Sequence, residues 1–185
     1  MPHQVGSFLL GKHFTSQPDR MPRLRVDSAQ TGFFEGREFR SYYEFSIAAG
    51  ATARLKYTAN TEFILFNQTL TVDAGGIRFT AVAAATEATA FSSALPIIGK
   101  NRMLERLQPY YNAANTIHSG GTYSGGTVVE VVRVVASQST AQESTVGGLI
   151  ADERGLPEGV YFLNLENISN GTATGVYSLF WEERV

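Results

Sequence analysis

Apolar and polar residues alternate with a period of two in two regions of the chain, residues 38–83 and 127–183. In 39–47 and 52–57 the alternation puts the apolar side chains on one face. Further short segments follow at 62–66, 68–72 and 77–83, with turn residues between them. Short strands spaced by about ten residues predict an all-β sandwich or barrel rather than βαβ units. The residues expected on the inner face are Phe39, Ser41, Tyr43, Phe45, Ile47, Ala53, Leu55 and Tyr57.

Residues 158–184, a stretch of 27 residues near the end of the chain, contain two strand-like runs, 159–169 and 176–183, on either side of six small or turn-prone residues. Each run has one wholly apolar face, as expected of a sheet that packs over a core on one side. This arrangement predicts an antiparallel hairpin at the centre of the sheet. The apolar faces carry Tyr161, Leu163, Leu165, Tyr177, Leu179 and Trp181.

The run Thr127–Ala136 is rich in valine, and both of its faces are mainly apolar, with one charge on each (Glu130 and Arg133). Such a strand fits the middle of a sandwich sheet or a contact between subunits. Residues 86–115 break the alternation and predict a long loop, with at most one helical turn at 103–107. The polar stretch 138–148 predicts a connection.

These patterns together predict an antiparallel β-sandwich or jelly roll of about eight strands over residues 37–185, with an extended N-terminal arm over 1–36. Helix should be limited to a turn or two. The predicted core contains Trp181, Leu179, Tyr177, Leu163, Phe45 and Val131.

Residues 1–36 contain three prolines and no sustained apolar period. A frayed terminus is one interpretation. We favour an arm ordered by a neighbouring subunit, because large apolar side chains are unfavourable in water and rare in disordered tails. The candidate interface residues are Phe8, Leu9, Leu10, Phe14, Arg23, Arg25, Phe33 and Phe34.

The amino-acid composition excludes several classes of function and of binding site. Apolar residues make up 43% of the chain and charged residues only 17%, which suits a protein packed against neighbours. The net charge of −2 excludes nucleic-acid binding by bulk electrostatics. The absence of cysteine excludes disulfides and thiolate sites. No run of 18 apolar residues and no signal-peptide core occurs, so we expect assembly in a cytoplasm and no membrane partner.

No motif predicts a catalytic, cofactor or metal site. His3, His13 and His118 lack the spacing of metal ligands. Paired glycines are interpreted as turns, since none forms a phosphate-binding motif. A glycosidase with paired carboxylates remains a remote alternative, because carboxylates at element ends are solvated by default. The carboxylates concerned are Asp152, Glu153, Glu158, Glu182 and Glu183.

Two segments resemble small virion proteins of tailed bacteriophages. They are Gly159-Val-Tyr-Phe-Leu-Asn-Leu-Glu-Asn-Ile-Ser with Gly175-Val-Tyr-Ser-Leu-Phe-Trp-Glu-Glu183, and Glu62-Phe-Ile-Leu-Phe-Asn-Gln-Thr-Leu-Thr-Val-Asp-Ala-Gly-Gly76. The resemblance covers roughly residues 38–185 and lies in short strands and a Thr/Ala/Gly-rich surface. It implies a domain that decorates or cements a capsid, or forms part of a tail or fibre, usually as a trimer.

We therefore expect a structural protein of the virion, most simply a capsid decoration or cement protein that contacts the major capsid protein or other virion proteins. A tail or fibre component, with or without binding of a host glycan, is the alternative. An enzyme acting on polysaccharide is a third and remote class. Exposed aromatic rings in a shallow groove would favour glycan binding.

Overall fold

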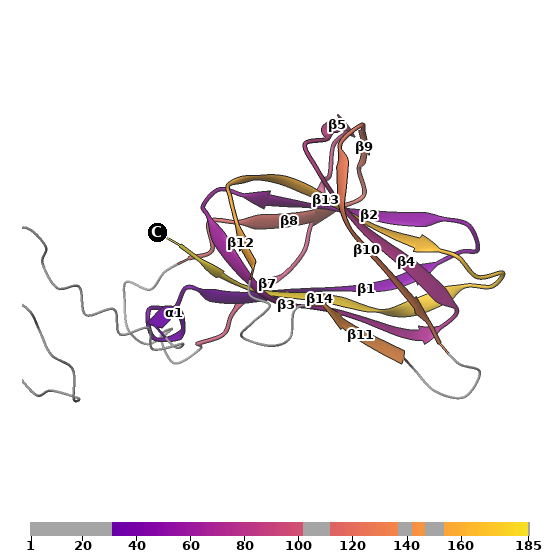
Figure 1. The fold of residues 1–185 in the computed structure, drawn as a ribbon, viewed down its shortest axis with the longest axis horizontal. Coiled ribbons are helices and arrows are strands. Elements are labelled where there is room, and N and C mark those ends of the chain that lie inside the picture. Colours follow the sequence, from indigo (N-terminus) through magenta and orange to yellow (C-terminus); the bar gives the residue numbers. More distant parts are fainter. Residues whose placement is uncertain (1–30, 102–111, 137–141, 147–153, 185) are drawn as a thin grey trace, which may run out of the picture. The chain divides into compact units, whose positions relative to one another are not determined.

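The computed structural model describes residues 31–101, 112–136, 142–146 and 154–184. Residues Gly32–Val185 form one compact unit, so residues 32–36 of the predicted arm belong to the same unit as the strands. Two six-stranded sheets and a two-stranded ribbon make up nearly all of the described part (Figure 1). The prediction of an all-β, antiparallel sandwich is confirmed. Helix is limited in these residues to α1 (Thr31–Phe34).

Sheet I has the order β11-β3-β14-β1-β7, and β12 also pairs with β3. Its strands are β1 (Glu38–Ile47), β3 (Phe63–Ala74), β7 (Ile97–Gly99), β11 (Gln142–Val146), β12 (Arg154–Leu156) and β14 (Ala173–Glu183). Sheet II has the order β10-β4-β13-β2-β8-β6. Its strands are β2 (Thr52–Ala59), β4 (Gly76–Ala83), β6 (Ser93–Ala94), β8 (Thr116–Ser119), β10 (Thr127–Val135) and β13 (Gly159–Asn167).

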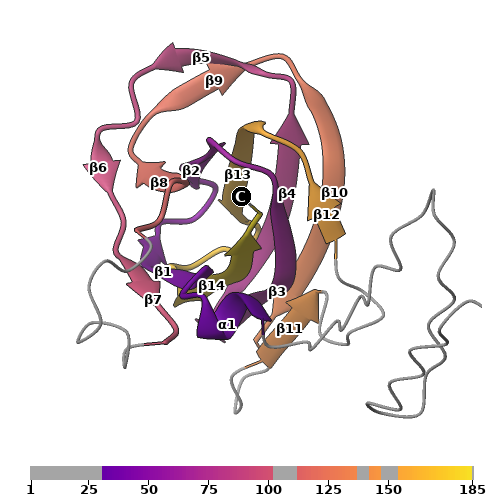
Figure 2. The same cartoon turned by 90° about the vertical axis from the view of Figure 1, so that its left-hand side faces the viewer.

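From β1 to β4, consecutive strands lie in opposite sheets. The chain passes from sheet I to sheet II between β1 and β2 and between β3 and β4, and returns between β13 and β14. The order β3-β14-β1 in sheet I therefore matches the order β4-β13-β2 in sheet II, and Figure 2 shows the two layers end-on.

The predicted C-terminal hairpin is wrong, although both of its strands are central as expected. β13 pairs with β2 and β4 in sheet II, whereas β14 pairs with β1 and β3 in sheet I. Both edges of each strand are occupied by other strands, so the two cannot pair with each other. The connection is held by Asn167, whose side-chain amide donates to the Ile47 and Gly171 carbonyl oxygens, both at 2.7 Å.

The core lies between the sheets and contains the predicted inner faces of β1, β2, β13 and β14. Trp181 is fully buried, and its ring meets the rings of Tyr57 edge-on and Phe39 at 6.0 Å between centroids. Five of the six predicted core residues are buried together. The sixth, Val131, is 54% exposed, because β10 lies at the edge of sheet II and not in its middle.

Residues 86–101 are not the long loop that the sequence predicted. β5 (Thr86–Thr89) pairs with β9 (Thr122–Ser124), β6 pairs with β8, and β7 pairs with β1. The β5–β9 ribbon stands on the outer face of sheet II, where Phe91 and Tyr123 pack on the buried ring of Phe162. The predicted connection at 138–148 contains β11, and the predicted helical turn at 103–107 lies outside the described residues.

Candidate functional site

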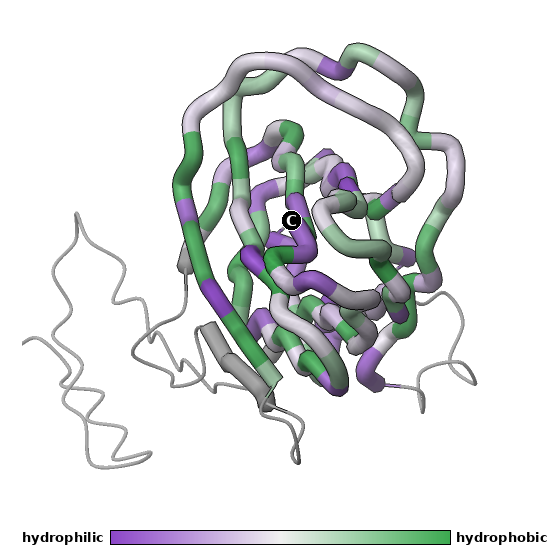
Figure 3. Tube along the Cα trace, turned by 90° about the vertical axis from the view of Figure 1, so that its right-hand side faces the viewer, coloured by the Kyte–Doolittle hydropathy of each residue, from purple (hydrophilic) through white to green (hydrophobic). Residues whose placement is uncertain are grey.

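The most apolar exposed surface of the described residues runs along β10. We call Val128, Val129, Val131 and Val135 the valine edge; each is between 54% and 58% exposed. Figure 3 shows β10 as a mainly hydrophobic strand at the side of the sandwich. Exposed valines on a sheet edge are a known association hazard, so such an edge is expected to have a partner.

The pairing of β10 explains why the edge is open. One side of the strand pairs with β4, and no strand of the described ranges is hydrogen-bonded along its other side. The register shifts between Val128 and Glu130, so Val129 is the extra residue of a β-bulge. Bulges increase the local twist and redirect side chains. Val128 consequently lines a surface hollow on the outer face of sheet II, while Val129 and Glu130 both line the interior described next.

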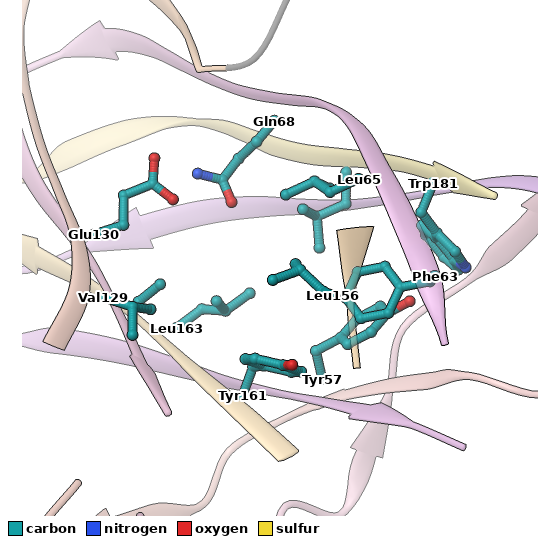
Figure 4. Close-up of a pocket in the computed structure, with 12 residues that line it drawn as sticks. Tyr57, Phe63, Leu65, Gln68, Val129, Glu130, Leu156, Tyr161, Leu163 and Trp181 are labelled. Atoms are coloured by element: carbon teal, nitrogen blue, oxygen red, sulfur yellow. The ribbon is translucent and has the colours of Figure 1, made fainter. Parts of the chain in front are cut away.

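A cavity of about 230 Å³ lies between the two sheets behind this bulge. Most of its wall is apolar, and one of its lining residues, Val129, is 58% exposed. Figure 4 shows Glu130 and Gln68 toward one end of the cavity and the rings of Phe63 and Trp181 toward the other. The lining residues also include Tyr57, Leu65, Ala81, Leu156, Tyr161, Leu163 and Leu179.

The polar end of the cavity is connected to the core through Tyr177. The Tyr177 hydroxyl donates to Gln68 Oε1 at 2.8 Å. Burial raises the pKa of Tyr177 well above its ordinary value, and the negative charge of Glu130 raises this pKa further. The charge of Glu130 therefore affects the ionisation of a tyrosine buried between the two sheets.

Two carboxylates that were expected to be solvated are buried. Glu183 is fully buried and accepts hydrogen bonds from the backbone N–H groups of Ala114 and Asn115 and from Trp181 Nε1. Glu182 is also buried, with a carboxylate oxygen 3.9 Å from an Arg37 guanidinium nitrogen. The expectation fails because segment 112–115 covers Glu183 on the core face of β14, while Glu182 on the opposite face packs against Gly32 and Arg37. Glu158 is exposed, and Asp152 and Glu153 lie outside the described residues.

A shallow hollow occupies the outer face of sheet I. Its rim includes Tyr42, which is 41% exposed, and Arg40, and the Lys100 ammonium lies 4.3 Å from the centroid of the Phe180 ring. The remaining lining residues are Ser41, Asn67, Thr69, Ser178 and Leu179. The hollow thus combines aromatic surface with hydrogen-bonding groups.

Six of the eight predicted interface residues, from Phe8 to Arg25, lie outside the described residues. Phe33 lies in α1, half-buried, where its carbonyl oxygen accepts a hydrogen bond from Asn101 and its ring lies 5.8 Å from the Lys100 ammonium. Phe34 ends α1. The structure therefore places Phe33 against the sandwich itself.

The sequence pattern identified the valine strand but not its position at an edge, and it gave no signal for the cavity.

Within the described ranges, no group of three or more His, Cys, Asp or Glu side chains could hold a metal ion. No helix in these ranges is long and apolar enough for a membrane span. Comparisons of the chain with protein-family models, curated proteins and solved structures found no match.

Proposed function

We propose that the chain is a structural virion protein of a tailed bacteriophage, a capsid decoration or cement protein that works as a homo-oligomer, a trimer in the simplest case. The observation that carries the proposal is the valine edge: an apolar sheet edge along which no strand of the described residues pairs. Association through this edge would cover it and remove its hazard.

The strand order of the two sheets also supports a structural protein of the virion. β1 and β2, β14 and β13, and β3 and β4 form pairs that match across the sheets, and β11 and β10 lie at the same end of the two orders. We infer from this order that the fold is a jelly roll, an architecture that capsid proteins share with lectins and cupins. Since a fold hosts several functions, the proposal rests on the edge and not on the fold.

The oligomer is tested by Val131→Lys, because Val131 is exposed and a lysine on an edge strand opposes strand pairing. The matched control is Tyr42→Lys, the same added charge on the outer face of sheet I. Light scattering after size exclusion should show that V131K dissociates while Y42K associates like the wild type. Equal association of all three would contradict an interface at β10.

The role in the virion is tested on particles. Cryo-electron microscopy of labelled virions should place the protein on the head, in contact with the major capsid protein. Deleting residues 2–30 should leave a folded oligomer that no longer stays on particles in high salt or chelator, since these residues include Phe8, Leu9, Leu10 and Phe14. Undiminished binding of the truncated protein would leave the arm without a role in attachment.

The alternative is a tail or fibre component that binds a host glycan, and the hollow on sheet I favours it. Sugars stack on exposed rings and hydrogen-bond to polar side chains, and Tyr42 with Arg40 and Asn67 offers both kinds of contact. Binding of the wild type to host polysaccharide, lost in Tyr42→Ala and retained in Val131→Ala, together with a tail location, would select this alternative over the capsid role.

A further inference from the structure

The hollow on the outer face of sheet II has the size of a ligand site. Its volume is about 370 Å³, and pockets that bind small molecules usually measure about 300–1,000 Å³. Its floor consists of β2, β13 and β4, which are neighbours in the sheet. Tyr123, Gly125 and Gly126 also line it, at the point where the β5–β9 ribbon rises from the sandwich (Figure 1).

Two rows of polar side chains cross the floor of this hollow. They alternate along each strand with residues of the core, so they face outward. In the order β2, β13, β4, one row is Arg54, Asn164 and Thr80, and the other is Thr52, Glu166 and Arg78. The guanidinium groups donate hydrogen bonds, the carboxylate accepts them, and the hydroxyl groups do both. Such a mixed surface suits a ligand with many hydroxyl groups.

The charges of the floor favour a ligand with one negative charge. Arg78 and Glu166 form an ion pair at 3.5 Å. Arg54 is half-buried, and no residue of the described ranges forms an ion pair or a hydrogen bond with its side chain. Arg133 lies opposite Arg78 on β10 and adds a positive charge beside the hollow. An ion pair with Arg54 would be screened less than one on an open surface, whereas Glu166 opposes a second negative charge on the ligand.

The hollow is held in shape by contacts of the protein itself. The Asn164 side-chain amide donates to the Thr80 hydroxyl at 3.0 Å and to the Tyr123 hydroxyl. The ring of Tyr123 stacks on the buried ring of Phe162, with centroids 4.4 Å apart. At Gly126 the chain passes so close to β4 that a Cβ would come within 2.6 Å of a β4 side chain. A preformed site loses little conformational entropy when a ligand binds.

We propose that this hollow binds an acidic sugar, a pyranose that carries one carboxylate. The carboxylate pairs with Arg54, and the ring hydroxyls hydrogen-bond to Thr52, Thr80 and Glu166. The site differs from the hollow considered above for a host glycan, which lies on the outer face of sheet I. It also does not depend on the capsid proposal, which rests on the valine edge.

The test uses three probes with the same ring and different groups at C6: glucuronate, glucose and glucose 6-phosphate. The full chain, labelled with nitrogen-15 and in its own state of association, is titrated with each probe and followed by amide NMR. Glucuronate should cause saturable shifts at Gly125 and Gly126, which line the hollow. It should bind about tenfold more tightly than glucose, because a hydrogen bond to a charged group is worth roughly 1.5 kcal/mol or more. Glucose 6-phosphate should bind more weakly than glucuronate.

Three variants locate the carboxylate. Arg54→Gln should reduce the affinity for glucuronate to that for glucose, whereas Arg54→Lys should keep the preference because it keeps the charge. The control is Arg40→Gln, which removes an exposed arginine from the outer face of sheet I and should bind like the wild type. If R54Q does not fold, the order of the three probes in the wild type and in R54K decides.

Four outcomes would overturn the inference. They are the absence of shifts with every probe, equal affinity for glucuronate and glucose in the wild type, tighter binding of glucose 6-phosphate than of glucuronate, and a loss of the preference in R40Q but not in R54Q. None of them bears on the association through the valine edge.

Discussion

Removing the buried carboxylate of Glu183 should destabilise the domain more than any exposed charge substitution. Three N–H groups of described residues donate to it: Ala114 N at 2.9 Å, Asn115 N at 3.0 Å and Trp181 Nε1 at 3.2 Å. The first binds Oε2, and the other two bind Oε1. Asn115 in turn donates to the Tyr57 hydroxyl at 3.0 Å, so the carboxylate ties segment 112–115 to the end of β14 and to the core.

The expected loss in the free energy of unfolding follows from the three N–H groups that donate to Glu183. In Glu183→Gln, the amide oxygen can replace Oε1 and keep two partners, but the amide nitrogen then faces the Ala114 N–H. One hydrogen bond to a charged acceptor is lost, which is worth roughly 1.5–3 kcal/mol, and release of the buried charge offsets part of it. We expect a loss of about 2 kcal/mol for E183Q. Glu183→Ala leaves all three donors unpaired and should lose about 4 kcal/mol or more.

The measurement is urea unfolding, monitored by Trp181 fluorescence and by far-ultraviolet circular dichroism, because the substitution alters the surroundings of the indole itself. Glu158→Gln is the control: this residue is exposed, and its substitution should change the free energy of unfolding by less than about 0.5 kcal/mol. If E183Q unfolds at the same urea concentration as E158Q, the buried network does not hold segment 112–115 and the reasoning is wrong.

Three further outcomes are expected. Gly175→Ala should lose about 1–3 kcal/mol in the same assay, because its methyl group would meet a backbone oxygen of β3; wild-type stability would refute this. Burial raises the pKa of Tyr57 and Tyr177, so stability should fall as pH rises above about 10, and both phenols should ionise only on unfolding, as ultraviolet titration can show. The hydrogen bond from Lys56 lowers the pKa of Glu87, so this contact is present at neutral pH and is lost as the pH falls through that pKa. In Lys56→Gln, carbon NMR should show that the pKa of Glu87 rises. An unchanged pKa would count against the contact.

The sequence alone determined which face of β1, β2, β13 and β14 is buried. Phe45, Leu55, Leu163 and Trp181 are all buried as the alternation predicted. This success has a local cause: side chains alternate along a strand whatever its partners are, so an apolar period of two identifies the core face. The same pattern established the all-β class and the central position of β13 and β14.

The tertiary structure alone decided how the strands pair and where they lie. Two adjacent runs with a short turn fit a hairpin or a connection between sheets equally well, and only the partners of β13 and β14 distinguish the two. A valine-rich strand has the same sequence at the edge or in the middle of a sheet, and the bulge at Val129 exists only relative to β4. Glu183 is buried because segment 112–115, some 68 residues away in sequence, supplies its donors. Backbone hydrogen bonds between distant segments carry no side-chain signature, so edge, cavity and buried carboxylate appear only in the folded chain.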